Sequence, residues 1–174
     1  MKAVHKNVPL TQLESQLDTL DRRIEGAEFL DQKARIMNLA GDLCFDAGQP
    51  ERALAYYESA INTYAAGAHY DSAALICKKI VALTPEAIRG YSRLAWLAVV
   101  RGMLEEARDR IGDYARAAEA TGLGREARGE LLGMAEMSDA SEVLESIGEA
   151  LLHLDDSVSA DAVFGRMRGT VSTS

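Results

Sequence analysis

Apolar residues near the start of the chain recur at alternating spacings of three and four. They are Leu10, Leu13, Leu17, Leu20 and Ile24, and this spacing places all five on one stripe of a helix. The pattern predicts an N-terminal amphipathic helix within residues 1–29. Such a stripe packs against the rest of the chain or against a second copy. We expect the first arrangement, with homodimerisation through this helix as the alternative.

The same helical periodicity continues along the chain between breaks at glycine and proline. Gly48, Gly102 and Gly122 end predicted helices, because glycine adopts the left-handed conformation at low cost. Pro50 and Pro85 are predicted in the first turns of the helices that follow them. Together with the N-terminal helix this gives eight predicted helices, the other seven at about 30–47, 50–66, 70–83, 86–101, 104–120, 124–137 and 140–153. Such short turns join antiparallel neighbours, so the predicted fold is all-α.

Matching residue types recur at a fixed spacing in the middle of the chain. The spacing between Ala73 and Ala107 is the same as that between Tyr57 and Tyr91. It equals the period of about 34 residues that is typical of tetratricopeptide repeats, in which each repeat is a pair of helices.

Two segments resemble the tetratricopeptide repeat in their residue types. In the first, the small, turn and aromatic positions of the repeat are occupied by Gly41, Gly48, Ala53, Tyr57 and Ala60. The second segment spans residues 93–107. Small residues at these positions let two helices approach closely while larger neighbours interlock. We therefore expect Ala53, Ala73 and Ala107 to be buried where helices cross.

The two segments do not share one repeat frame, because the separation of Ala53 and Ala73 is much shorter than one period. One consistent frame takes residues 54–87, 88–121 and 124–157 as repeats. The resemblance implies a right-handed superhelical stack of antiparallel helix hairpins, an α-solenoid, over residues 30–157. Residues 1–29 would cap this stack, since terminal elements of repeat arrays are atypical. Residues 158–174 are expected to form a flexible tail.

The chain is acidic, with 27 Asp and Glu residues against 19 Lys and Arg residues and a net charge of −8. No nucleic-acid partner is expected, because binding to phosphates needs a positive surface. The acids concentrate between Glu126 and Asp161, which indicates either a solvated face or a surface for a basic partner. No apolar run approaches the roughly 18 residues of a membrane span, and no signal peptide is recognised. A cytoplasmic protein without membrane insertion is therefore expected, with Cys44 and Cys77 as buried small hydrophobes.

The resemblance also implies a concave groove, lined by the first helix of each pair, that holds a partner segment. The partner-binding side chains expected on it are Asn62, Arg89, Ser92, Arg93, Trp96, Arg125 and Arg128. Arg89 and Arg93 are one helical turn apart, and Trp96 is within reach of Arg93 for a cation–π contact. Guanidinium groups pair well with carboxylates, so an acidic segment or a free carboxylate terminus is the predicted partner. The alternative is that these arginines are solvated and pair with nearby glutamates.

Motifs for catalysis or cofactor binding are not found in the sequence. His5, His69 and His153 are isolated from other metal-ligand residues, and no nucleophile elbow or phosphate loop is present. We expect no metal, no cofactor and no enzymatic activity, and interpret the chain as a protein-binding adaptor. One alternative is a dedicated chaperone, because the overall plan resembles the type III secretion chaperones of translocator proteins. Another is a helical enzyme or enzyme regulator with an unrecognised site.

Overall fold

The computed structural model describes residues 10–171, with side chains placed as far as residue 168. Within this range the fold is all-α, as predicted, and contains no strand. Its helices are α1 (Leu10–Gly26), α2 (Leu30–Asp46), α3 (Pro50–Ala66), α4 (Tyr70–Leu83), α5 (Ile88–Val100), α6 (Leu104–Thr121), α7 (Gly124–Glu136), α8 (Ser141–His153) and α9 (Ser157–Val171). The seven helices predicted after the first are all present as α2 to α8, with small shifts at their ends.

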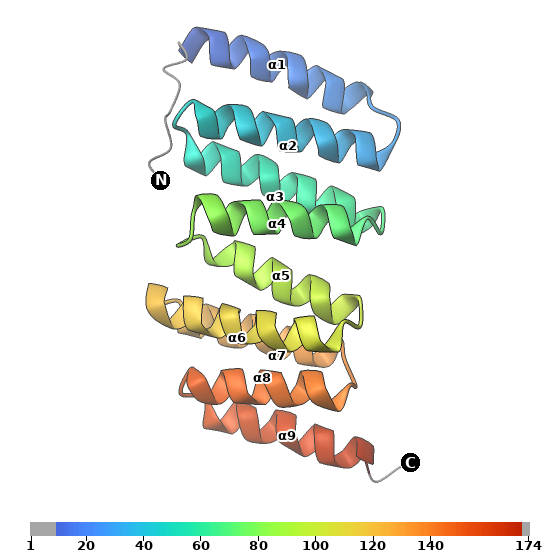
Figure 1. Ribbon diagram of the computed structural model, residues 1–174, viewed down its shortest axis with the longest axis vertical. Coiled ribbons are helices and arrows are strands. Elements are labelled where there is room, and N and C mark those ends of the chain that lie inside the picture. The colour runs from blue at the N-terminus through green and yellow to red at the C-terminus, as the bar shows by residue number, and fades with distance from the viewer. Residues whose placement is uncertain (1–9, 172–174) are drawn as a thin grey trace. The chain divides into compact units, whose positions relative to one another are not determined.

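The expected flexible tail at residues 158–174 is wrong over most of its length, because Ser157–Val171 forms a helix, α9 (Figure 1). Asp156 caps this helix by accepting a hydrogen bond of 3.1 Å from the backbone nitrogen of Ser159. This hydrogen bond lowers the pKa of Asp156. Ala160 and Val163 are buried, but so short an apolar stripe among serines gives little sequence signal. Residues 172–174 of the predicted tail lie outside the described residues.

The turns between helices follow most of the sequence signals. Left-handed glycines lie at three helix ends, as predicted: Gly48, Gly102 and Gly122, with φ of 73°, 66° and 73°. Pro50 is in the first turn of α3, also as predicted. Pro85 differs, because α5 begins only at Ile88. The backbone nitrogen of Ala87 donates to the carbonyl oxygen of Thr84 at 2.8 Å, which places Pro85 second in a β-turn, a position that proline favours.

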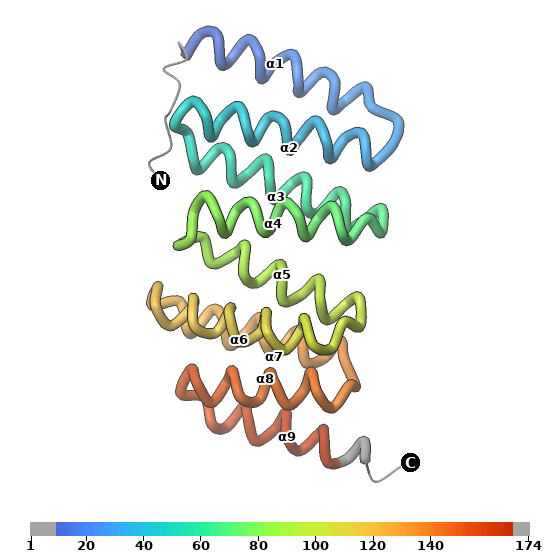
Figure 2. The backbone as a smooth tube through the Cα atoms, in the orientation of Figure 1, coloured from blue at the N-terminus to red at the C-terminus, as the bar shows by residue number. Residues whose placement is uncertain are grey.

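The chain divides into two compact units, Met1–Ile80 and Val81–Ser174, and each is described by itself. The boundary falls inside the 30–157 region that is predicted from the sequence to form one repeat domain. Within each unit, successive helices run antiparallel (Figure 2). In unit 1, Leu13, Leu17 and Leu20 of α1 are buried, so the N-terminal stripe packs within the chain as expected. Leu10 is 66% exposed, and homodimerisation through α1 stays a prediction.

Two glycines mark places where helices approach closely. In unit 1, the Tyr57 ring of α3 lies so near Gly41 of α2 that a Cβ atom there would be 2.5 Å from Cε1 of the ring. In unit 2, the Phe164 ring of α9 lies against Gly148 of α8 in the same way. The ring follows the glycine at the same separation along the chain in both pairs, so a glycine and a ring interlock across one helix hairpin.

Helices also contact the next helix but one within each unit. In unit 1, Arg52 of α3 bonds Glu14 of α1, 38 residues away. In unit 2, Ser92 of α5 bonds Glu130 of α7, also 38 residues away, and α6 packs on α8. Contacts at a separation near one repeat length are typical of stacked helix pairs. The alanines predicted at helix crossings, Ala53, Ala73 and Ala107, are fully buried, which confirms that expectation.

We expect Gly41→Ala to destabilise the protein, because its methyl group would meet the Tyr57 ring. Overpacking costs about 1–3 kcal/mol, while the better helix propensity of alanine offsets about 1 kcal/mol of that. The matched control is Gly133→Ala in α7, where nothing lies within 4 Å of the new Cβ and a gain of about 0.5–1 kcal/mol is expected. Urea unfolding followed by circular dichroism measures both. Equal stabilisation by the two substitutions would contradict the Gly41–Tyr57 interlock.

Candidate functional site

The predicted partner surface is assembled only in part, on α5. Arg89 and Arg93 are exposed, and Trp96 is half-buried against the core of unit 2. Among the described residues no cation–π contact joins Arg93 to Trp96. Ser92 is buried, with 9% of its surface exposed, so little of it is available to a partner.

Ser92 forms its hydrogen bond inside the protein. Its hydroxyl donates to the carboxylate of Glu130, which also accepts a hydrogen bond of 2.7 Å from the hydroxyl of Tyr114. These bonds place Glu130 on the side of α7 that faces α5. At about 100° per residue, Arg125 and Arg128 lie about 140° and about 160° around α7 from Glu130. The two arginines of α7 therefore project from a different side of the helix than the one that meets α5.

Arg128 and Asn62 belong to helices other than α5. The Nε atom of Arg128 donates to the carbonyl oxygen of Gly124 at 3.3 Å, and its charge contributes to the lowered pKa of Asp156 at the start of α9. Asn62 is exposed on α3, which belongs to unit 1. Of the seven predicted residues, the structure brings together Arg89, Ser92, Arg93 and Trp96 on one helix.

The hollows within the units lie between other helices. In unit 1, a groove of about 440 Å³ lies between α1 and α2, and a smaller hollow of about 200 Å³ lies between α2, α3 and α4. In unit 2, a hollow of about 210 Å³ lies between α6 and α8. We take the α1–α2 groove as the candidate site because it is the largest of these three.

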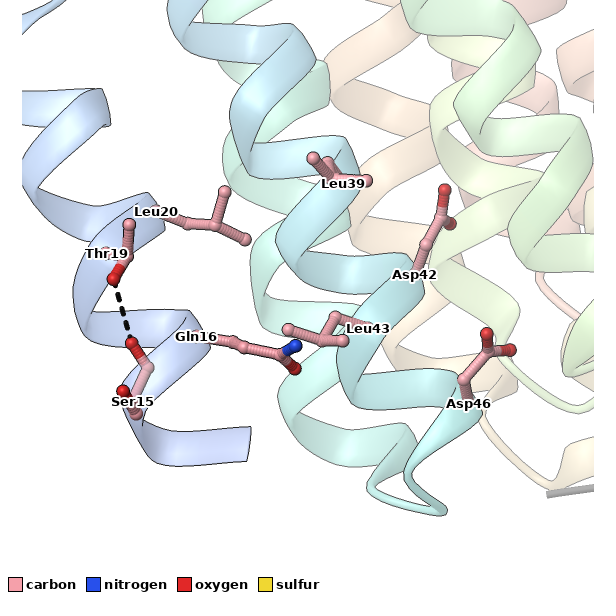
Figure 3. Close-up of a pocket in the computed structure, with 8 residues that line it drawn as sticks. All are labelled: Ser15, Gln16, Thr19, Leu20, Leu39, Asp42, Leu43 and Asp46. Atoms are coloured by element: carbon pink, nitrogen blue, oxygen red, sulfur yellow. Dashed lines mark hydrogen bonds between the residues drawn. The ribbon is translucent and has the colours of Figure 1, made fainter. Parts of the chain in front are cut away.

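The α1–α2 groove is partly apolar and has an acidic rim on one side. Its lining is Ser15, Gln16, Thr19 and Leu20 from α1, and Leu39, Asp42, Leu43 and Asp46 from α2. Figure 3 shows Leu20 and Gln16 extending from α1 toward α2, while Asp42 and Asp46 project from α2 on the side away from α1. Leu39 is 50% exposed. One face of α2 thus alternates leucine and aspartate, and α1 supplies an uncharged wall.

Asp42 is held in place by side chains from α3 and α4. Its Oδ1 atom accepts hydrogen bonds from the Tyr57 hydroxyl at 2.6 Å and from Nζ of Lys79 at 2.7 Å. Lys79 also donates to Asn38 at 2.9 Å and lies 5.1 Å from the centroid of the Tyr57 ring. Within the described residues, the Oδ2 atom of Asp42 makes no hydrogen bond, and Asp46 makes neither a hydrogen bond nor an ion pair. Both carboxylates therefore retain capacity to accept donors from a ligand.

The two flanks of α1, on either side of its leucine stripe, have different partners. On one flank, the guanidinium of Arg52 contacts both carboxylate oxygens of Glu14, at 2.6 and 3.2 Å, and lowers the pKa of Glu14. On the same flank, Tyr56 donates a hydrogen bond of 3.0 Å to Asp21. The other flank presents the uncharged Gln16 to the groove. The acids of α1 bonded to α3 thus lie away from the groove, whose carboxylates all come from α2.

This groove is not predicted from the sequence, although part of its signal is present there. Leu39 and Leu43 extend the apolar surface of α2 beyond its buried residues Ala40 and Cys44. This second apolar edge predicts contact with something further. The pattern does not reveal that α1 leaves the edge partly open, because the separation of two helices is set by the side chains of both.

No protein-family model matches the chain, and a search of curated proteins finds no significant match. The tetratricopeptide resemblance therefore stays a prediction from the residues quoted above. In the part of the chain that the structure describes, no three His, Cys, Asp or Glu side chains are grouped so that they could hold a metal ion. None of the described helices combines the length and the apolar character needed to cross a membrane.

Three tyrosines that donate hydrogen bonds to carboxylates predict a loss of stability at alkaline pH. Burial and a hydrogen bond to a carboxylate raise the pKa of Tyr56 to about 12 and also raise the pKa of Tyr57 and of Tyr114. A tyrosine in the unfolded chain loses its proton near pH 10, whereas the folded side chains keep theirs. Unfolding therefore releases protons above about pH 10, and the free energy of unfolding falls as the pH rises toward about 12.

Urea unfolding at a series of pH values measures this slope. The triple variant Tyr56→Phe/Tyr57→Phe/Tyr114→Phe is expected to show a clearly shallower decline than the wild type, since phenylalanine has no proton to release. An identical slope for the two proteins would contradict the assignment and attribute the alkaline decline to other groups.

Proposed function

We propose that this protein is a cytoplasmic, non-enzymatic protein-interaction module of the tetratricopeptide type, which binds a segment of a partner protein. The observation that carries the proposal is the α1–α2 groove of about 440 Å³, which is open to solvent and partly apolar. Sites that bind ligands are typically concave surfaces of this kind, with a few fixed polar groups that orient the ligand. A helical partner segment bound in an apolar groove is a recurring mode of peptide recognition.

The chemistry of the groove supports binding rather than catalysis. A partner that covers Leu39 removes apolar surface from water, which contributes about 25 cal/mol per Å². Asp42 is already held by Tyr57 and Lys79, so little conformational freedom is lost when it accepts a further hydrogen bond. The lining includes no histidine, cysteine or lysine, the residue types most often used as nucleophile or base beside a carboxylate.

The arginines of α5 remain a second candidate surface, for an acidic partner. We favour the α1–α2 groove because it is a hollow with exposed apolar side chains, whereas Ser92, between Arg89 and Arg93 in the chain, is engaged by Glu130. The two surfaces lie in different units of the chain, so separate variants distinguish them.

We expect Leu39→Asp to abolish partner capture from a lysate of the source cells. Losing the burial of the exposed half of Leu39 costs about 1 kcal/mol, and a carboxylate placed against the apolar surface of the partner costs about 1 kcal/mol or more in addition, so roughly a 10-fold or greater loss of affinity is expected. Leu39 is half exposed, so the substitution leaves the core intact. The matched control is Leu152→Asp on α8, because Leu152 is 47% exposed and lies outside the groove.

Quantitative mass spectrometry of the captured proteins gives the result. A protein retained by the wild type, by Leu152→Asp and by the charge-reversal variant Arg89→Glu/Arg93→Glu, but lost with Leu39→Asp, supports the groove. A captured protein that is lost only with Arg89→Glu/Arg93→Glu would indicate that the partner binds the arginines of α5 instead. Retention of every captured protein by all variants would contradict both surfaces.

A further inference from the structure

We infer that the segment bound in the α1–α2 groove is a basic amphipathic helix. Its apolar stripe would cover Leu39 and Leu43, and two Lys or Arg side chains one helical turn apart would face Asp42 and Asp46. This inference rests on the proposed function and names the partner class of the same site.

The charge of the partner follows from the one-sided rim. The rim carries two carboxylates, and no basic side chain lines the groove. Lys79 neutralises part of the charge of Asp42 through Oδ1, but Asp46 has no ion pair among the described residues. A basic segment gains charge-assisted hydrogen bonds at both carboxylates. An acidic segment would meet repulsion from Asp46, which has no base beside it among the described residues.

The spacing of the partner's basic residues follows from the helix that carries the rim. Asp42 and Asp46 are four residues apart and thus lie on one face of α2, separated by about 6 Å along the axis. A ligand helix running beside α2 presents residues i and i+4 at the same spacing. Leu39 and Leu43 repeat at this spacing too. The apolar positions of the ligand can therefore face the leucines of α2 while its basic positions face the aspartates.

A second copy of this chain is disfavoured as the occupant. Each copy carries a net charge of −8, so an acidic rim adds to the repulsion between copies. The apolar stripe of α1, which could otherwise enter a neighbouring groove, is used internally: Leu13, Leu17 and Leu20 are at most 8% exposed. A basic partner protein meets neither obstacle.

The test is selection from a displayed library of random peptides of about 14 residues, or four helical turns, on the immobilised full-length chain. Clones are first sorted by whether they lose binding to Leu39→Asp, which identifies groove binders. We expect these clones to carry net positive charge, with Lys or Arg four residues apart beside an apolar stripe. The strongest clone is then synthesised as a labelled peptide and titrated by fluorescence anisotropy.

For this peptide, Asp46→Lys should weaken binding about tenfold, because one attractive charge pair becomes repulsive, and added salt should weaken binding to the wild type. The matched control is Asp161→Lys, at an exposed acid of α9, which should leave the affinity unchanged. Groove binders that are neutral or acidic would contradict the inferred basic character of the partner, and so would a basic peptide whose affinity is unchanged by Asp46→Lys. Either result would still support binding in the groove. A library without any Leu39-dependent clone would contradict peptide binding in the groove, and with it the proposed function.

Discussion

The close approach of α2 and α3 at Gly41 is the constraint on which the candidate site depends. Because position 41 carries no side chain, the Tyr57 ring lies directly against α2, and its hydroxyl reaches the next residue of that helix, Asp42. A packing requirement of the core thereby fixes a carboxylate at the edge of the groove. In unit 2, Phe164 packs against Gly148 in the same manner. Since phenylalanine has no hydroxyl, the packing there positions no polar group.

The helix pairs can be compared with the two repeat frames that the tetratricopeptide resemblance predicts. Among the described helices the most extensive contacts join α2 to α3, α5 to α6 and α8 to α9. The α2/α3 pair matches the predicted frame of Gly41, and the α5/α6 pair matches the predicted frame of residues 88–121. Helix bounds and the burial of Ala53 and Ala107 could be predicted from the sequence, because periodicity and turn residues act over one or two helices. The choice of pairs could not, since it depends on which neighbouring surfaces fit most closely. The weak stripe of α9 escaped prediction for the same reason, because it is buried by packing on the preceding helix, α8.

The predicted site shows the same division between local and distant information. Arg89, Arg93 and Trp96 share one surface of α5 because their spacing within a single helix requires it. The arginines of α7 do not join them, because α7 turns Glu130 toward Ser92 of α5 and buries Leu131 and Met134 in the core. Sequence spacing defines which residues share a face, but the direction in which that face points is decided by contacts with another helix.

The acids of α1 lie on the flank away from the groove, and this makes the two walls of the groove differ in charge. Arg52 and Tyr56 of α3 bond Glu14 and Asp21 on the flank of α1 that lies away from the groove. The carboxylates that line the groove all come from α2, so a bound helix meets an uncharged wall on one side and acids on the other. A ligand with basic residues on both flanks of its stripe would have to desolvate one set without a partner. The groove therefore selects the rotation of the ligand about its own axis as well as its charge.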